Sequence, residues 1–302
     1  MNSIPYHVPA LLQATVDGLA IKPDGIYVDV TFGGGGHSRA IIEKLGEHGR
    51  LYGMDRDIDA YANAIDDSRF TFIHSNFAYL GNFMRYHGVD KVDGIVADLG
   101  VSFHHFDDPE RGFSFRQDSA LDMRMNRSSA VSAATLLATI DESRLADVLF
   151  LYGELRQARR MATAIVKARA TRPLLTTGDL IAVVKPFIKP GAEKKELAQV
   201  FQALRIEVNG ELVSLRRLLD ASLAVLKPGG RLAVLTYHSL EDRMVKNFIR
   251  SGNVEGILDK DFYGRVNSPL RAVNNKVIVP DDDEIASNPR SRSAKLRIAE
   301  RV

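Results

Sequence analysis

The feature that most constrains this chain is a run of four glycines, Gly33 to Gly36, that follows an apolar segment at 26–30. A short stretch with helical apolar spacing comes next, and a second apolar segment at 51–54 ends in Asp55. This order predicts a strand–helix–strand unit with a glycine turn after its first strand. Glycines at such a turn let the backbone approach a ligand closely, because no Cβ intervenes.

The acid that ends the second strand indicates what the turn binds. Asp55 lies about 20 residues beyond the glycines, the offset at which a carboxylate can bind both hydroxyls of a ribose. A dinucleotide site requires a third glycine, but the closest frame is Gly33-x-Gly35-x-x-Ser38. Asp29, just before the turn, would repel a pyrophosphate and suits a cationic ligand. S-adenosylmethionine, with its sulfonium and ammonium, is therefore the predicted cofactor, and a plain packing turn is the alternative.

A third strand is predicted at 70–73. In a doubly wound sheet the loop after this strand reaches the adenine edge of a bound nucleoside. Asn76 and Phe77 could supply a hydrogen bond and an apolar face there. Packing of Phe77 in the core is the alternative.

A fourth strand at 92–97 is almost entirely apolar, as buried parallel strands are, and ends in Asp98. Ligands of such sheets bind beyond the carboxyl ends of the strands, so Asp98 should join Asp29 and Asp55 on one rim. Three acids at three strand ends are hard to explain by solvation alone. They favour a binding site.

Strand–helix alternation stops after Gly100 for about a hundred residues, and only helical spacing remains. We therefore predict an α/β fold: a doubly wound sheet formed by residues 1–106 and 207–302, with an inserted all-helical domain at 107–206. On one helix of the insertion a polar stripe indicates either a solvated face or a face that contacts phosphates. The stripe consists of Arg156, Arg160, Thr163 and Lys167.

The sheet pattern resumes with a strand at 231–236, followed by Tyr237 and His238, which are candidates for positioning a substrate base or for a structural role. The acidic run at 281–284 is interpreted as a solvated loop. The basic tail, NPRSRSAKLRIAERV, alternates weakly and is interpreted as an edge strand with a basic outer face. A short helix is also expected at 58–65.

Composition excludes several classes of protein. With 302 residues, 45% hydrophobic and 26% charged, the chain can bury a sizeable core, and a net charge of +2 confines any nucleic-acid surface to a local patch. The absence of cysteine excludes disulfides and thiolate chemistry. No signal peptide and no apolar window of membrane-spanning length is present, so we expect a soluble, cytoplasmic protein. No pattern predicts an oligomeric state.

Seven blocks occur in one order: TFGGGGHS, DLGVS, ERGFSF, LDMRM, FQALRIEVNGEL, YHSLEDR and NPRSRSAKLR. With the strand-end acids, they resemble class I S-adenosylmethionine-dependent methyltransferases and, within these, the RsmH/MraW family of small-subunit ribosomal RNA methyltransferases. The resemblance runs from about His7 to Arg301. It implies methylation of the N4 amine of a cytidine near the decoding centre of 16S ribosomal RNA, with the RNA or the small subunit as partner.

Site residues follow from the resemblance position by position. It implies that Gly35, Gly36 and His37 hold the methionine part of S-adenosylmethionine. Asp55 would bind the ribose and Phe77 the adenine, and Asp98 would line the pocket. The family continues DLGVS with Ser-Pro-Gln, where this chain has Phe103, His104 and His105. His105 takes the place of the glutamine and can still make one hydrogen bond to the cofactor.

Other interpretations remain at this stage. A nicotinamide-dependent oxidoreductase shares the glycine turn but explains none of the later blocks. A catalytically silent RNA-binding module fits the basic tail but needs no acids at its strand ends. A metal site at His104, His105, Asp107 and Asp108 is disfavoured, because adjacent histidines rarely converge on one ion.

Overall fold

The computed structural model describes residues 9–100, 108–274 and 276–302. The chain forms two compact units, one made of Met1–Gly100 and Val213–Val302 and the other of Val101–Leu212. The expected division was at 106/107 and 206/207, a few residues from these limits. We call them the sheet unit and the insertion unit.

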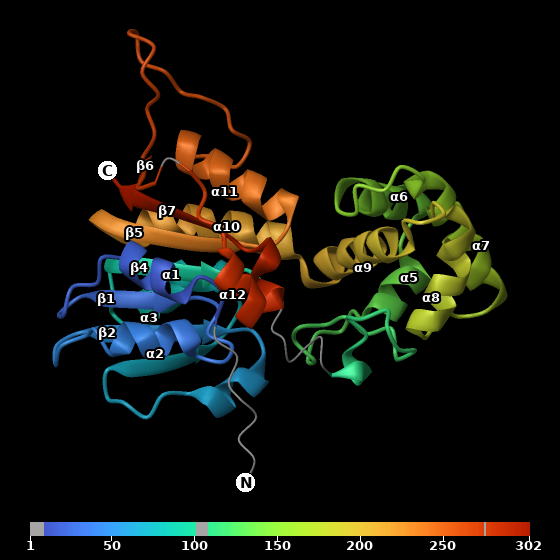
Figure 1. The fold of residues 1–302 in the computed structure, drawn as a ribbon, viewed down its shortest axis with the longest axis horizontal. Helices are drawn as coiled ribbons and strands as arrows, with labels where there is room; N and C mark the ends of the chain where they lie inside the picture. The colour runs from blue at the N-terminus through green and yellow to red at the C-terminus, as the bar shows by residue number, and fades with distance from the viewer. Residues whose placement is uncertain (1–8, 101–107, 275) are drawn as a thin grey trace. The chain divides into compact units, whose positions relative to one another are not determined.

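The sheet unit is built on seven strands in the order β3-β2-β1-β4-β5-β7-β6 (Figure 1). Strands β1 to β5 are parallel, and β7 is antiparallel to both of its neighbours. This arrangement confirms the predicted doubly wound α/β fold. The strands are β1 Ile26–Asp29, β2 Arg50–Asp55, β3 Phe70–His74, β4 Val92–Asp98, β5 Leu226–Thr236, β6 Leu270–Ala272 and β7 Lys295–Arg301.

Two apolar layers sandwich the sheet. On one face α3, α10 and α11 bury apolar side chains against β4 and β5. On the other face α1 and α2 bury Val16, Ile41 and Ile42. In β4, Ile95 belongs to the first layer and Val96 to the second, because successive strand residues point to opposite faces. The helices are α1 Leu12–Gly18, α2 Gly36–Ile42, α3 Leu80–Tyr86, α10 Glu211–Val225, α11 Ser239–Ser251 and α12 Asp282–Ser287.

The C-terminal tail differs from its prediction. β7 lies between β5 and β6, so β6 is the edge strand instead. The expected basic outer face of the tail is partly neutralised within the unit, since Arg297 forms an ion pair of 2.7 Å with Asp242 and Arg301 donates to the Pro269 carbonyl. Alternation alone does not distinguish an edge strand from an inner one, and this prediction was wrong.

Three other local predictions also needed correction. Residues 281–284 are no loop: Asp281 caps α12, its side chain accepting from the Glu284 amide, so the acids fill the first turn of a helix. The helix expected at 58–65 is a 3-10 helix, η1 Ile58–Asn63. The strand expected at 231–236 begins earlier, at Leu226, and its pairing with β4 shifts register in the added segment.

The insertion unit is helical around its own core, which Leu145, Met161 and Phe201 help to fill. Ser132 and Thr176 begin two of its helices with capping boxes. Its elements are η3 Pro109–Arg111, α5 Ala133–Thr139, α6 Glu142–Leu151, α7 Ala158–Thr171, α8 Thr177–Val184, η4 Lys185–Phe187 and α9 Glu193–Asn209. Among the residues the structure describes, no helix is long and apolar enough to span a bilayer.

Candidate functional site

The three strand-end acids lie at one edge of the sheet. β1, β2 and β4, which end in or beside Asp29, Asp55 and Asp98, are neighbours and run in the same direction. Their carboxyl ends therefore meet, as the sequence predicts. The glycine turn that follows β1 lies at the same edge, because the Phe32 amide donates to the Met54 carbonyl of β2.

The glycine turn is fixed by bonds from three directions. The Gly33 amide donates to Asp55 Oδ2 at 2.7 Å, Asn63 Nδ2 donates to the Gly33 carbonyl at 3.0 Å, and Arg39 Nη1 donates to the Gly34 carbonyl at 2.7 Å. Gly35 has a φ of +76°, and a Cβ there would lie 2.5 Å from Arg39 Nη1. Only glycine fits this position without strain.

Asp29 lies beneath the turn and is only 1% exposed. Its two oxygens accept hydrogen bonds from Ser38 Oγ at 2.7 Å and from the Thr31 amide at 3.1 Å. Burial raises the pKa of Asp29, partly offset by the nearby His37 and these donors. The geometry assigns Asp29 to holding the turn and the start of α2, where the sequence suggested an attraction for a cationic ligand.

His37 and Asp98 face each other at the centre of the site. His37 Nδ1 is 3.9 Å from Asp98 Oδ2, and the His37 ring is 4% exposed. His37 Nε2 and Asp98 Oδ1 are both buried, and neither forms a hydrogen bond of ordinary geometry within the described part of the chain. Such orphaned polar atoms are rare in folded proteins, and they mark a position where a ligand can supply the missing partner.

The pKa of Asp98 is set by opposing effects. Burial raises it, while His37 and the hydroxyl of Tyr237 lower it. Burial and the neighbouring Asp98 raise the pKa of Tyr237, so its hydroxyl stays protonated and donates toward the Asp98 carboxylate. Tyr237 therefore has a defined position beside Asp98.

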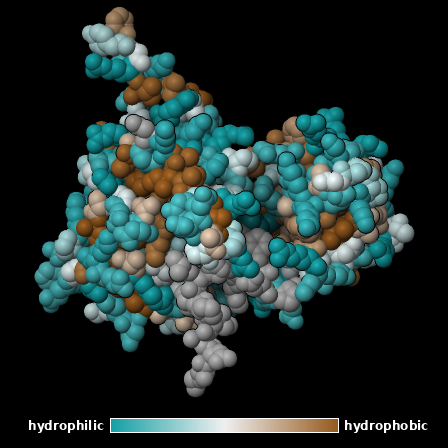
Figure 2. Space-filling model, viewed as in Figure 1, coloured by the Kyte–Doolittle hydropathy of each residue, from teal (hydrophilic) through white to brown (hydrophobic). Residues whose placement is uncertain are grey.

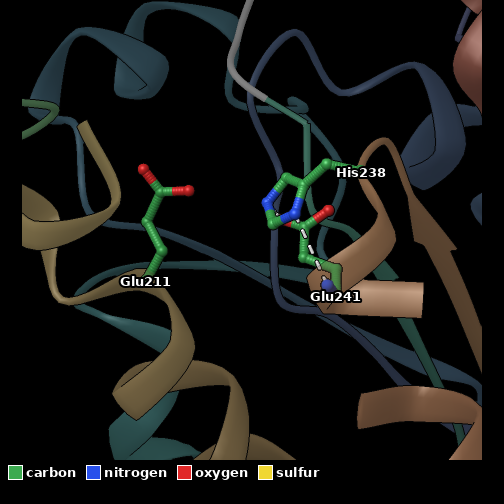
Figure 3. A group of neighbouring side chains, drawn as sticks. All are labelled: Glu211, His238 and Glu241. Carbon is green, nitrogen blue, oxygen red and sulfur yellow. Dashed lines mark hydrogen bonds and ion pairs between the residues drawn. The ribbon is translucent and has the colours of Figure 1, made fainter. Parts of the chain in front are cut away.

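His238 is held by its own helix. It caps α11 by accepting from the Glu241 amide, a contact drawn in Figure 3, and its Nε2 lies 3.1 Å from Glu241 Oε1. Glu241 also accepts from the Tyr237 amide at 3.0 Å, which anchors the end of β5. These contacts fix the His238 ring at the start of α11. Glu211, also drawn in Figure 3, belongs to the insertion unit, where it accepts from Arg205 of the same unit at 2.9 Å.

The loop after β3 places the other predicted cofactor residues. Asn76 Oδ1 accepts from the Ala78 amide and Asn76 Nδ2 donates to Ser214 Oγ at 3.2 Å, so this side chain organises the loop. Phe77 is half-buried and packs against the core cluster of α3 and α10. His105 lies outside the described residues, as do His104 and Asp107, while Asp108 pairs with Arg127 at 3.0 Å.

Two residues of the polar stripe, Thr163 and Arg160, make contacts within the insertion unit. Thr163 donates to Glu142 at 2.5 Å, and the Arg160 guanidinium lies 5.5 Å from the centre of the Phe187 ring. Arg156 precedes α7 rather than sharing its face. The four residues therefore do not form one uniform helical face.

Sequence reasoning missed three residues that shape the turn, namely Thr31, Arg39 and Asn63. The Asp98 amide donates to Thr31 Oγ1 at 2.6 Å, which ties β4 to the turn. Arg39 also donates to the Asn63 carbonyl at 2.9 Å. Nothing in their sequence spacing indicates these contacts, because the Thr31 contact depends on the pairing of β1 with β4 and the Asn63 contacts depend on how η1 folds back over the turn.

Known proteins resemble this chain over nearly its whole length. A model of the MraW methylase family matches residues 5–302. A ribosomal RNA small subunit methyltransferase H of Bacteroides thetaiotaomicron is 60% identical, and the match covers 99% of each chain. The protein of that name from Flavobacterium johnsoniae is 53% identical over 100% of this chain and 99% of its own. Among solved structures, a putative rRNA-methylase from Clostridium thermocellum aligns with a TM-score of 0.46 at 13% identity, covering 98% of this chain and 100% of that one.

Proposed function

Because the chain belongs to the MraW methylase family, we propose that it methylates the N4 amine of a cytidine in small-subunit (16S) ribosomal RNA near the decoding centre, with S-adenosylmethionine as methyl donor. The name shared by its relatives supports small-subunit ribosomal RNA as the substrate class. A substrate of this kind places the reaction in the cytoplasm.

The residues at the sheet edge fit S-adenosylmethionine. The orphaned His37 Nε2 offers a hydrogen bond to the methionine part, and the turn at Gly35 and Gly36 lets a ligand approach the backbone. We assign the ribose hydroxyls to Asp55, whose carboxylate also accepts from the Gly33 amide of the turn. We assign the adenine to the half-buried ring of Phe77. We also assign to His105 the one hydrogen bond to the cofactor that the family resemblance implies. The cofactor supplies a methyl group activated by a sulfonium.

The observation that carries the mechanism is the unsatisfied Oδ1 of Asp98. A cytosine N4 amine is a weak nucleophile, because its lone pair is delocalised into the ring. Asp98 Oδ1 accepts a hydrogen bond from this amine, orients it and stabilises the positive charge that develops on nitrogen during attack. Burial raises the pKa of Asp98, and His37 and Tyr237 oppose this effect and so favour the ionised carboxylate.

The substrate base must leave its stack to reach Asp98, which costs a few kcal/mol. We assign the binding of flanking RNA to the insertion domain at 107–206 and to the basic segment that contains Arg290 and Arg292. Both arginines are exposed. Phosphate contacts by such residues position the RNA without reading its sequence.

A methyl-transfer assay with unmethylated small-subunit RNA and assembled small subunits tests the proposal. We expect methyl incorporation that nuclease digestion and mass spectrometry locate on the N4 of one cytidine. Asp98→Asn should abolish most of the rate and leave the cofactor bound, as calorimetry measures. Incorporation at another atom would refute the assigned chemistry, and binding of RNA without any methyl transfer would identify a silent RNA-binding module.

A further inference from the structure

Between α11 and β6 the chain forms a hairpin at residues 259–267 that projects from the sheet unit (Figure 1). Lys260 and Val266 pair as an antiparallel bridge, and the Asn267 amide donates to the Asp259 carbonyl at 2.8 Å. We call this segment the aromatic hairpin.

The tip of the aromatic hairpin is a well-formed turn. The Gly264 amide donates to the Asp261 carbonyl, and Gly264 has a φ of +80°, which together make a turn closed by a left-handed residue. Asp261 Oδ1 accepts from the Tyr263 and Arg265 amides at 2.9 Å each. Asp261 and Gly264 thus hold the turn. The turn itself does not require large or apolar side chains at the two residues between them.

These two residues are instead Phe262 and Tyr263, which are 97% and 83% exposed. Their ring centroids are 5.6 Å apart, and their planes are nearly perpendicular at 87°. Neither ring serves the turn or the core, and two adjacent aromatic side chains on an exposed tip are a liability unless a partner covers them. In Figure 2 the projection carries both apolar and hydrophilic surface at its end.

Charge indicates the chemistry of that partner. The two acids of the hairpin are used internally, since Asp261 holds the turn and Asp259 accepts from Asn267 at 3.3 Å. Lys260 and Arg265 form no ion pair with any residue that the structure describes. Exposed rings beside uncommitted cations are the combination that binds unpaired nucleotides, with bases on the rings and phosphates at the cations.

We infer that the aromatic hairpin binds unpaired nucleotides of ribosomal RNA by stacking bases on Phe262 and Tyr263. The inference rests on the proposed function for the identity of the RNA. Helix α11 starts beside Tyr237 at the carboxyl edge of the sheet and runs back for 13 residues. A helix of this length spans about 20 Å, so the chain that continues into the hairpin starts far from the site, and the hairpin makes a second, remote contact with the substrate.

Filter binding of the full chain to protein-free small-subunit ribosomal RNA tests the hairpin directly. A Phe262→Ala/Tyr263→Ala variant should bind at least about tenfold more weakly, because each stacked base contributes strongly to affinity. Phe262→Leu/Tyr263→Leu keeps the apolar area but removes the π faces, and it should bind as weakly as the alanine variant. Phe262→Tyr/Tyr263→Phe should restore binding. Tyr86→Ala removes another exposed aromatic, 82% accessible on α3, and should leave affinity unchanged.

Two results would overturn the inference. Wild-type affinity in the leucine variant would show that apolar contact suffices, and a loss seen with assembled subunits but not with protein-free RNA would identify a ribosomal protein as the partner. Methyl transfer by the wild-type enzyme is measured in the same preparation. Weaker RNA binding by the variants beside an inactive wild type would refute the proposed function alone, whereas an active wild type with unaffected variants would refute the hairpin alone.

Discussion

The Gly33 amide donates a 2.7 Å hydrogen bond to Oδ2 of Asp55, so the glycine turn and the second strand share one carboxylate. Asp55 Oδ1 accepts from the Asp57 amide at 2.8 Å. The carboxylate therefore fixes the turn before any ligand binds. A cofactor that binds at this turn meets a preformed site, which lowers the cost of ordering on binding.

We expect Asp55→Ala to weaken S-adenosylmethionine binding by about 1.5–3 kcal/mol for each hydrogen bond to the carboxylate that is lost, or roughly 10- to 150-fold. Isothermal calorimetry measures this directly. The affinity of Asp55→Asn for S-adenosylmethionine should fall between those of the wild type and Asp55→Ala, because one acceptor oxygen remains. Asp66→Ala, which removes an exposed acid close in sequence, should bind like the wild type; equal affinity for Asp55→Ala would remove this residue from the cofactor site.

Tyr237→Phe should shift the pH dependence of methyl transfer. The Tyr237 hydroxyl lowers the pKa of Asp98, so its removal raises that pKa further above the usual carboxyl value. The ionised form then persists only at higher pH, and the acid limb of kcat should move upward while cofactor affinity is unchanged. Tyr79→Phe, at a half-exposed tyrosine, is the control. An unmoved acid limb would contradict the role assigned to Tyr237.

Alanine substitutions at two glycines should change the free energy of unfolding in opposite directions. A Cβ at Gly53 would lie 2.8 Å from the rings of Phe32 and Phe70, so Gly53→Ala should destabilise the protein by about 1–3 kcal/mol. A Cβ at Gly81 in α3 meets nothing within 4 Å, and Gly81→Ala should stabilise it by about 0.5–1 kcal/mol. Thermal unfolding of both variants checks the pair, and a lower midpoint for Gly81→Ala would contradict the reasoning.

Reversing the charge of Arg290 and Arg292 should weaken binding to small-subunit RNA and leave cofactor binding intact. Two lost phosphate contacts should reduce the slope of log affinity against log salt by about 2. The charge-matched control reverses Arg85 and Arg217, which are exposed elsewhere. Equal RNA affinity of the Arg290/Arg292 variant and the wild type at several salt concentrations would exclude this segment from the interface.

Much of the sheet could be predicted because its strands are strongly patterned. The segments that became β1 to β4 are short and largely apolar, and acids mark the ends of three of them, β1, β2 and β4. Asp281 also carried a readable signal, with a glutamate three residues later, but the acidic run was interpreted as solvated instead of as a capped helix.

The contacts at the centre of the site were not predictable in the same way. Asp98 and Tyr237 come from β4 and the end of β5, which the insertion separates in sequence, and only the folded sheet brings them together. Asn63 reaches Gly33 because η1 is a 3-10 helix of six residues, shorter than the helix expected there. Pairings of this kind depend on where the chain turns, to within one residue.

The pairing of β4 with β5 has a consequence for synthesis on the ribosome. β5 leaves the exit tunnel roughly 130 residues after β4, on the order of ten seconds later at usual elongation speeds. During that interval the growing edge of the sheet has no partner strand and is open to mispairing. The helical insertion, whose contacts are local, can fold in the meantime and bring the ends of its segment together. Slow codons placed after residue 212 would lengthen the exposed interval, whereas rapid folding of the insertion would shorten the search that β5 must make.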